Sequence, residues 1–229
     1  MFEYLFLDLD DTILDFQKAE HIAIGRVMEK YGVDPTEERR ARYSQINKWH
    51  WHQLEKGTMT RDEVLEGRFS AFFAELGVDV DRYAVARIYE EYLSQGHWFL
   101  PGAEEAVKTL SKKYRLFLAS NGTAIVQKGR MTSANLYRFF ETSFVSQEIG
   151  HNKPSKAYFD AAFATIPGFD PKKCLMVGDS LTSDILGGIN AGIATCWVNP
   201  THAPGREDIR PDYEIEYLHQ LEALLEGLK

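Results

Sequence analysis

Apolar positions follow two different patterns along this chain. A run of four apolar residues, Tyr4–Leu7, comes first and is typical of a short buried strand. From about residue 15 to residue 98, apolar residues recur every three or four positions, which is the spacing of one helix face. Within that block, Thr60 and Glu63 have the spacing of a capping box at the start of a helix. We therefore expect one strand followed by four helices.

Beyond Pro101 and Gly102, short apolar runs alternate with helical stretches, as they do in a parallel α/β sheet. The expected strands are 116–119, 144–146, 175–177, 195–198 and a weaker one at 213–215, and the expected helices include 157–163 and one through Leu221 and Leu225. Because the first strand belongs with this later group, the helical block is predicted to be an insertion. The expected fold is α/β, with a three-layer Rossmann-like parallel sheet core (residues 1–14 and 99–229) and an inserted α-helical cap (residues 15–98).

Two carboxylates stand where the first strand should end. Asp8 and Asp10 are two positions apart, and residues i and i+2 of a strand face the same way. Open α/β sheets bind ligands outside the carboxyl ends of their strands, so both side chains should meet one ligand. Like charges at this spacing raise each other's pKa unless a cation neutralises them, and a hard divalent ion, Mg²⁺ by default, meets that need. We interpret Asp11 as a turn or helix-capping residue.

Three further polar segments follow the later strands. Ser120 and Asn121 offer a hydroxyl and closely spaced backbone N–H groups, which suit phosphate oxygens. Lys153 provides an ammonium that could hold both a phosphate and a carboxylate nucleophile. Asp179 and Asp184 add a second pair of carboxylates. An aspartate at one strand end often only starts a turn, but polar groups at four strand ends favour a common site.

Composition limits the classes of function. With 229 residues and 44% hydrophobic content, the chain can bury a substantial core. Lys+Arg 26 against Asp+Glu 34 gives a net charge of −8, so we expect no nucleic-acid partner. No window approaches the roughly 20 apolar residues of a membrane span, and the first residues carry no basic leader, so we expect a cytoplasmic protein without a membrane partner. Cys174 and Cys196 are expected to be buried structural thiols.

Together these residues resemble the haloacid dehalogenase-like hydrolase superfamily. Its four motifs correspond to Asp8-Leu9-Asp10-Asp11-Thr12, Ser120-Asn121-Gly122, Lys153-Pro154 and Gly178-Asp179 through Asp184. The helical insert resembles the first class of caps in that superfamily. Further segments resemble its pyrimidine 5′-nucleotidase branch, namely 54–57, 178–185, 190–192 and 196–200.

The resemblance implies catalytic roles for Asp8 and Asp10. Asp8 would attack phosphorus and form an aspartyl-phosphate intermediate, a known form of covalent catalysis. Asp10 would protonate the departing ester oxygen and then take a proton from the water that hydrolyses the intermediate.

The resemblance also implies how the cofactor and the substrate are held. Mg²⁺, or another divalent ion such as Mn²⁺, would be bound by Asp8, the Asp10 backbone carbonyl and Asp179, with Asp184 acting through water or orienting these ligands. Phosphoryl oxygens would be held by Ser120, the Asn121 backbone and Lys153. No nucleotide or flavin cofactor is implied.

The predicted function is a magnesium-dependent phosphatase of small phosphate monoesters, with pyrimidine nucleoside 5′-monophosphates as the first choice. A sugar-phosphate phosphatase of the same superfamily is the alternative enzyme. A dehalogenase needs neither Asp10 nor the metal, so the presence of Asp10 and Asp179 favours phosphoryl transfer. A receiver-like phosphoacceptor module is the alternative from another class, and the long helical insert argues against it. Substrate preference, oligomeric state and preferred metal are left open by the sequence.

The cap contains an aromatic cluster, Trp49-His50-Trp51-His52, that could stack on or hydrogen-bond a nucleobase. Neighbouring positions on a helix point in different directions, however. We therefore expect the tryptophans to pack inside the cap, and leave His50 and His52 open as substrate contacts.

Overall fold

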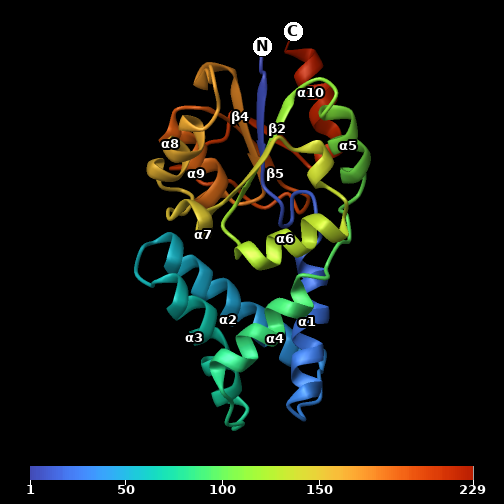
Figure 1. Cartoon of the computed structure of the whole chain (residues 1–229), viewed down its shortest axis with the longest axis vertical. Coiled ribbons are helices and arrows are strands. Elements are labelled where there is room, and N and C mark those ends of the chain that lie inside the picture. Colours follow the sequence, from blue (N-terminus) through green and yellow to red (C-terminus); the bar gives the residue numbers. More distant parts are fainter. Residues whose placement is uncertain (229) are drawn as a thin grey trace. The chain divides into compact units, whose positions relative to one another are not determined.

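The computed structural model describes residues 1–228, which include a parallel sheet and a set of helices (Figure 1). The sheet has six strands in the order β3-β2-β1-β4-β5-β6, and all neighbours pair in parallel. The strands are β1 (Tyr4–Leu7), β2 (Arg115–Ser120), β3 (Thr142–Val145), β4 (Cys174–Gly178), β5 (Ala194–Val198) and β6 (Tyr213–Ile215). The predicted α/β fold is confirmed.

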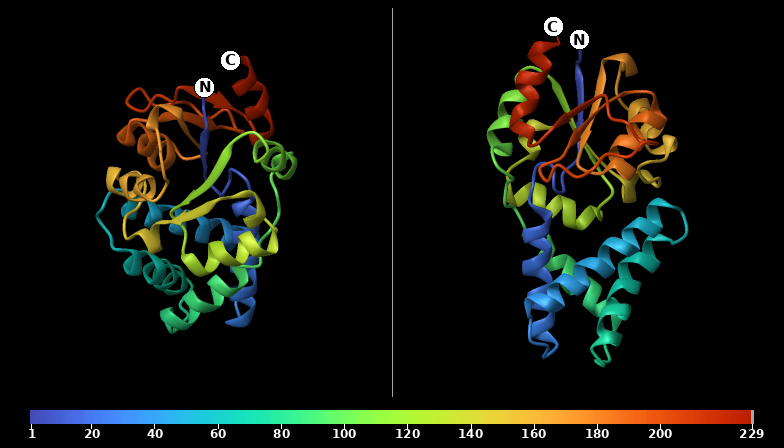
Figure 2. Two further views of the ribbon diagram at one scale, coloured as in Figure 1. Left: turned by 45° about the horizontal axis from the view of Figure 1, so that its top comes forward. Right: turned by 180° about the vertical axis from the view of Figure 1, so that it is seen from behind.

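Helices cover both faces of this sheet, which makes the three layers (Figures 1 and 2). On one face, α5 (Ala103–Leu110) and α10 (Leu221–Gly227) lie side by side. On the other face lie α8 (Lys156–Ala164) and α9 (Leu186–Ala191). Further short elements belong to the same part of the chain as the sheet. They are α6 (Ala124–Ser133), α7 (Ser146–Ile149), the 3₁₀ turns Tyr137–Phe139, Pro171–Lys173 and Leu218–Gln220, and a π-helix at Leu181–Ile185.

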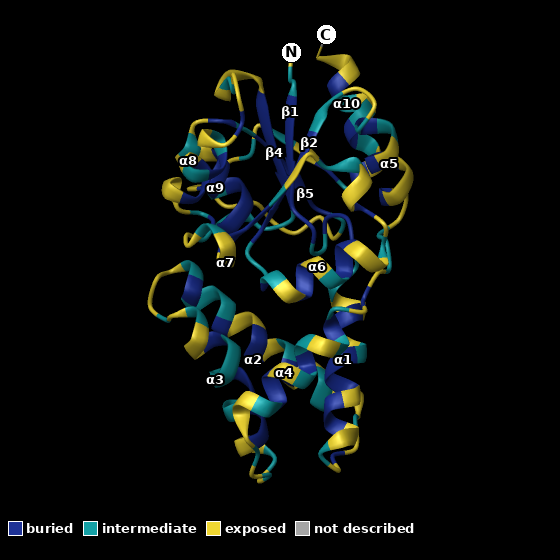
Figure 3. Ribbon diagram, in the orientation of Figure 1, coloured by how far each residue is buried: buried dark blue, intermediate teal, exposed yellow. Residues whose placement is uncertain are grey.

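Strand β1 lies at the centre of the sheet because its residues can be buried on both faces. All four are buried, and most of the strand is drawn dark blue in Figure 3. Leu5 and Leu7 pack into the core cluster that includes α5 and α10, whereas Tyr4 and Phe6 pack into the cluster that includes α8. An unbroken apolar run of this kind is what a parallel strand covered on both sides requires.

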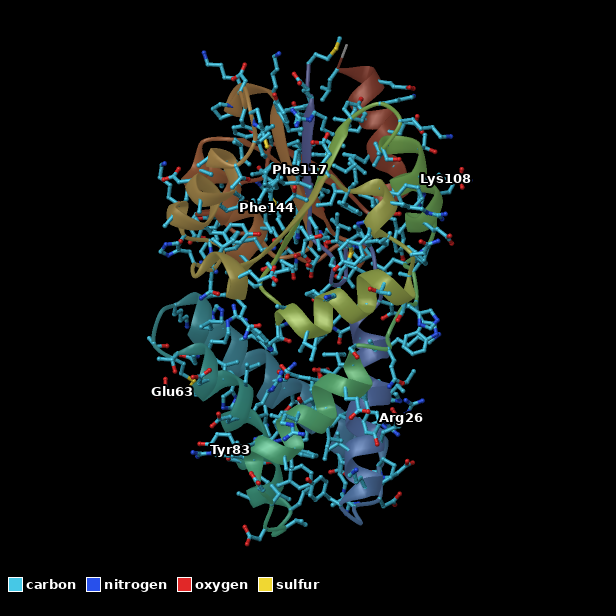
Figure 4. The ribbon with its side chains drawn as sticks, in the orientation of Figure 1. Arg26, Glu63, Tyr83, Lys108, Phe117 and Phe144 are labelled. Atoms are coloured by element: carbon cyan, nitrogen blue, oxygen red, sulfur yellow. The ribbon has the colours of Figure 1, made fainter. Side chains whose placement is uncertain are left out.

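Aromatic rings fill the core on the α8 side of the sheet. Phe117 of β2 and Phe144 of β3, both labelled in Figure 4, have ring centroids 5.9 Å apart. Phe6 stacks on both, with ring centroids 5.2 Å from Phe117 and 5.6 Å from Phe144.

Cys174 and Cys196 are buried and free, as expected of structural thiols.

The third strand begins and ends earlier than predicted. The sequence pattern placed it at 144–146, but β3 is Thr142–Val145, and Ser146 is the first residue of α7. Thr142 and Ser143 are more exposed than Phe144 and Val145, because β3 is an edge strand with a neighbour on one side only. An apolar run therefore marks only the buried half of such a strand.

The chain divides into two compact units, one of Met1–Phe16 with His97–Lys229 and the other of Gln17–Gly96. Apart from Phe16, the second unit contains the four expected helices, α1 (Phe16–Lys30), α2 (Glu37–Glu55), α3 (Arg61–Glu75) and α4 (Arg82–Leu93). At the start of α3, the Thr60 hydroxyl accepts from the Glu63 N–H, and the Thr60 N–H donates to Glu63 Oε2 at 2.7 Å. The predicted capping box is thus confirmed.

The expectation that both tryptophans pack inside the cap is wrong for Trp49, which is 53% exposed. The buried face of α2 is formed by residues at helical spacing, among them Tyr43, Ile46 and His50, and Trp49 lies beside that face. His50 is buried, with Nδ1 2.8 Å from the Ile46 carbonyl oxygen. Trp51 is half-buried, and the Arg68 guanidinium lies 5.9 Å from the centre of its ring.

Within residues 1–228, no helix combines the length and apolar character that a bilayer crossing requires.

Candidate active site

The polar residues singled out in the sequence meet at one edge of the sheet. Asp8 follows β1, Ser120 ends β2, Lys153 follows β3 and α7, and Asp179 follows β4. These four strands are neighbours in the sheet, and in a parallel sheet their carboxyl ends share an edge. The backbone N–H of Asp8 donates to the Val177 carbonyl at 2.9 Å, which continues the pairing of β1 with β4 up to the nucleophile candidate.

Three carboxylates form a cluster at this edge. Asp8, Asp179 and Asp184 each place a carboxylate oxygen within 4.8 Å of the others. Burial raises the pKa of Asp8 to about 8, and the charges of Asp184 and Asp10 add to the rise while Lys153 opposes it. Burial, followed by the charges of Asp184 and Asp8, raises the pKa of Asp179 well above its usual value. Burial therefore disfavours the ionised forms of Asp8 and Asp179, and the neighbouring carboxylates add to that effect.

This donor set fits a hard divalent cation. All three groups offer oxygen, the ligand type that Mg²⁺ and Ca²⁺ prefer. A cation among them would also favour the ionised forms of Asp8 and Asp179, whose pKa values are raised mainly by burial and further by neighbouring carboxylates. The chemistry of the site thus agrees with the predicted Mg²⁺.

Lys153 is the one ammonium group in direct contact with this cluster among the described residues. Its Nζ lies 2.7 Å from Asp8 Oδ1, 2.6 Å from Asp184 Oδ1 and 2.6 Å from the Ala119 carbonyl oxygen, and the residue is 1% exposed. Burial alone would lower its pKa, but the charges of Asp184 and Asp8 outweigh that effect and raise the pKa above its usual range. Lys153 therefore remains charged and pairs directly with the nucleophile candidate.

Asn121 uses its side chain to hold the Lys153 segment in place. Its amide nitrogen donates to the Lys153 carbonyl at 2.9 Å and to Ser183 Oγ at 3.1 Å, and its amide oxygen accepts from the Lys153 N–H at 2.9 Å. The side chain is thus committed to protein groups. The predicted binding of a phosphate by the Asn121 backbone stays a prediction.

Asp184 is buried behind the site and is fixed by two donors. Its Oδ1 accepts from Lys153, and its Oδ2 accepts from the Ser180 N–H at 3.1 Å. Gly178 makes room for it, because a Cβ atom at that position would lie 2.2 Å from Asp184 Oδ2. A glycine at the end of β4 is therefore a requirement of the carboxylate that follows it.

Asp10 and Asp11 point to different neighbours. The Asp10 carboxyl group is held by helix α6, where Gln127 Nε2 lies 2.7 Å from Oδ2 and Arg130 Nη1 pairs with Oδ1. Asp11 adopts a positive φ of 55°, and its Oδ1 accepts from the Phe16 N–H at the start of α1. The interpretation of Asp11 as a turn and capping residue is confirmed.

Sequence reasoning missed Gln127 and Arg130. Neither belongs to a recognisable motif, and they lie more than 110 residues from Asp10, with sequence separations of 117 and 120. The available signal was an arginine on the same helix face as apolar Val126 and Met131, which would place a charge in a core position.

This chain is similar to known proteins along most of its length. A family model described as haloacid dehalogenase-like hydrolase matches residues 2–192. The HAD-hydrolase YfnB of Bacillus subtilis is 40% identical over 221 residues, which is 96% of this chain and 94% of that protein. A crystal structure of YfnB bound to magnesium superposes with a TM-score of 0.93 and covers 98% of both chains.

Two of the more similar relatives are named as pyrimidine 5′-nucleotidases. The pyrimidine 5′-nucleotidase PynA of Streptococcus pneumoniae is 35% identical over 93% of this chain and 91% of its own length. The pyrimidine 5′-nucleotidase YjjG of Escherichia coli is 33% identical over 97% of both chains.

Proposed function

This chain belongs to the haloacid dehalogenase-like hydrolase family, and from that premise we propose that it is a phosphatase of small phosphate monoesters. The observation that carries the proposal is the buried contact between the Lys153 ammonium and Asp8, at the centre of a cluster of carboxylates. Membership of a hydrolase family also counts against the receiver-like alternative, which would bind a phosphoryl group without turnover.

Asp8 supplies the nucleophile in this proposal. Lys153 holds Oδ1 of its carboxylate, so Oδ2 is the oxygen left to attack phosphorus. The new Oδ2–P bond forms as the bond from phosphorus to the ester oxygen breaks. The product of this step is an aspartyl phosphate and a departing alcohol.

Asp10 transfers the protons in both halves of the reaction. Its carboxyl group gives a proton to the departing ester oxygen, and the resulting carboxylate takes a proton from the incoming water. That water attacks phosphorus, the Oδ2–P bond breaks, and inorganic phosphate leaves while the Asp8 carboxylate is restored. Ser120, the Asn121 backbone N–H and Lys153 hold the phosphoryl oxygens during transfer.

Asp8, Asp179 and the Asp10 backbone carbonyl would hold Mg²⁺, with Asp184 orienting these ligands. Bound there, the ion would neutralise charge on the phosphoryl group and the carboxylates. The magnesium found with YfnB, and the all-oxygen donor set, support this assignment.

Pyrimidine nucleoside 5′-monophosphates are the proposed substrates. PynA and YjjG, which carry that activity in their names, align with more than nine-tenths of this chain. Their likeness therefore includes the helical insert as well as the sheet domain.

The test is phosphate release from a panel of nucleoside monophosphates and sugar phosphates, with and without Mg²⁺, alongside Asp8→Asn. We expect magnesium-dependent release that favours pyrimidine nucleotides and that falls by at least roughly a thousandfold in the variant, because the amide cannot act as the nucleophile. A preference for sugar phosphates would overturn the substrate and leave the mechanism in place. Absence of release from every ester would overturn the phosphatase itself.

A further inference from the structure

Helix α6 contributes two buried polar side chains that transfer no proton and hold no phosphate in the proposed reaction. Gln127 is 1% exposed and Arg130 is 0% exposed. They are three positions apart and so share one face of the helix. Both reach the carboxyl group of Asp10, each at a different oxygen. We propose that Gln127 and Arg130 are positioning residues that fix the Asp10 acid and the Ser120 hydroxyl for phosphoryl transfer, an inference that rests on the proposed function.

The two contacts fix the orientation of the Asp10 carboxyl group. Gln127 Nε2 donates to Oδ2 at 2.7 Å, and Arg130 Nη1 pairs with Oδ1. A carboxyl group held at both oxygens can rotate about neither of its side-chain torsions without losing a partner. A general acid must lie within hydrogen-bond reach of the leaving oxygen, so a fixed orientation is of direct use to the reaction.

Gln127 also orients the hydroxyl of Ser120. A serine hydroxyl has one O–H donor and two acceptor positions. Ser120 Oγ accepts from the Gly122 N–H at 3.1 Å and from Gln127 Nε2 at 2.7 Å, so both acceptor positions are occupied. The hydroxyl hydrogen must therefore point in a third direction, where it can donate to a phosphoryl oxygen. One amide group thus links the acid to the phosphate-binding hydroxyl.

The orientation of the Gln127 amide follows from its neighbours. Asp10 Oδ2 and Ser120 Oγ both serve as acceptors here, so the side of the amide that faces them is the nitrogen. Its two hydrogens go to Asp10 and Ser120. Gly122 admits this arrangement, because a Cβ atom there would lie 2.3 Å from Gln127 Nε2.

These side chains are costly to bury, which argues against a purely structural role. Within residues 1–228, Gln127 Oε1 is buried and has no hydrogen-bond partner. An unsatisfied buried carbonyl and a buried guanidinium both reduce stability relative to apolar side chains of similar size. The hydrogen bonds and the ion pair that these side chains form with Asp10 and Ser120 offset part of that loss of stability.

The test compares two esters whose leaving groups differ in their need for a proton. An alkyl ester, a pyrimidine nucleoside 5′-monophosphate, needs an acid at the leaving oxygen, whereas p-nitrophenyl phosphate releases a weakly basic phenolate. Since kcat/KM reports steps up to departure of the leaving group, we expect Arg130→Met to lower it roughly 10–100-fold for the nucleotide and less than about threefold for the aryl ester. Gln127→Met should lower both values, and the nucleotide value more, because it also releases Ser120.

Three further variants control for folding and for general effects on α6. Arg130→Lys retains a cation and should recover part of the nucleotide activity, which a purely structural loss would not do. Lys128→Met, at an exposed position of the same helix, should leave both values unchanged. Asp10→Asn should show the same selective loss as Arg130→Met. Thermal unfolding midpoints show whether each variant is folded.

An equal loss on both esters in folded Arg130→Met, or no loss in either positioning variant, would overturn the inference and leave the phosphatase in place. Failure of the parent enzyme to hydrolyse either ester would overturn the proposed function, and this inference with it. A crystal structure of Gln127→Met gives a second measurement, in which the Asp10 side chain should leave its present orientation. An unchanged Asp10 would contradict the proposal.

Discussion

At the scale of single residues, Lys153 joins two carboxylates that would otherwise repel each other. Its ammonium contacts Asp8 and Asp184 in a region closed to solvent. Removing one member of a buried ionic group leaves the remaining charges uncompensated, which is more costly than losing an exposed pair. Lys153 is thus needed for the stability of the site as well as for its chemistry.

We expect Lys153→Met to reduce the free energy of unfolding by about 3–5 kcal/mol and to abolish phosphate release. Urea denaturation without added metal measures the first effect. Lys156→Met is the matched control, because Lys156 forms an exposed pair with Asp160, and its loss should cost less than about 1 kcal/mol. A Lys153→Met variant as stable as the parent would show that the buried contacts contribute no net stability.

Gly178 is a second residue whose importance comes from a neighbour. We expect Gly178→Ala to displace the Asp184 carboxylate, because the added Cβ would lie 2.2 Å from its Oδ2. The cost should be about 1–3 kcal/mol in unfolding free energy, as for other overpacked sites, with a loss of phosphate release. Gly205→Ala is the control, since a Cβ there meets nothing within 4 Å. Equal effects of the two variants would contradict the explanation.

At the scale of elements, the start of α3 shows how a local motif can act independently of the active site. The N–H and hydroxyl of Thr60 both donate to Glu63 Oε2, at 2.7 and 2.9 Å. The backbone hydrogen bond, and then that from the hydroxyl, lowers the pKa of Glu63 below its ordinary value of 4.5. The charged form of Glu63 is therefore the form that stabilises the helix.

This shift predicts a pH dependence of stability. A carboxyl group with a lowered pKa in the folded state contributes stability that is fully present above its unfolded pKa and is lost as the pH falls through its folded pKa. We expect the difference in unfolding free energy between the parent and Glu63→Gln to be constant near neutral pH and to shrink below about pH 4.5. Urea denaturation across that pH range checks it. A difference that grows in acid would have the wrong sign.

At the scale of the whole molecule, the carboxylate cluster predicts that metal binding stabilises the folded chain. A ligand that binds only the native state at about 100 times its Kd adds about 2.7 kcal/mol, which corresponds to roughly 5–10 °C in Tm for a chain of this length. We expect Mg²⁺ to raise Tm by that order. Calorimetric or spectroscopic melting with increasing Mg²⁺ measures the shift.

Two substitutions distinguish a specific site from a general effect of salt. Asp179→Asn should remove most of the magnesium-dependent shift, because it takes one carboxylate from the cluster. Asp79→Asn, at an exposed position far along the chain from the cluster, should leave the shift intact. A shift that survives in Asp179→Asn would place the metal elsewhere.

Local patterns in the sequence were enough to predict the α/β fold and the residues at the sheet edge. Apolar runs such as Tyr4–Leu7 mark strands buried on both faces, and polar residues directly after them mark the strand ends. The carboxyl ends of parallel strands share an edge of the sheet. The sequence was therefore enough to predict that four residues lie close together, namely Asp8, Ser120, Lys153 and Asp179. The catalytic roles of these residues stay predictions until the variants are measured.

The groups that support these residues depend on the packing of distant elements. Gln127 and Arg130 meet Asp10 across more than 110 positions of sequence, and no local pattern records which strand end a helix will pack against. The same holds for Trp49, whose exposure depends on which face of α2 is buried. The strands and the polar residues at their ends could be predicted from the chain alone, since the alternation of apolar and polar positions is a local property. The side-chain partners depend on packing between distant elements, which only the folded chain defines.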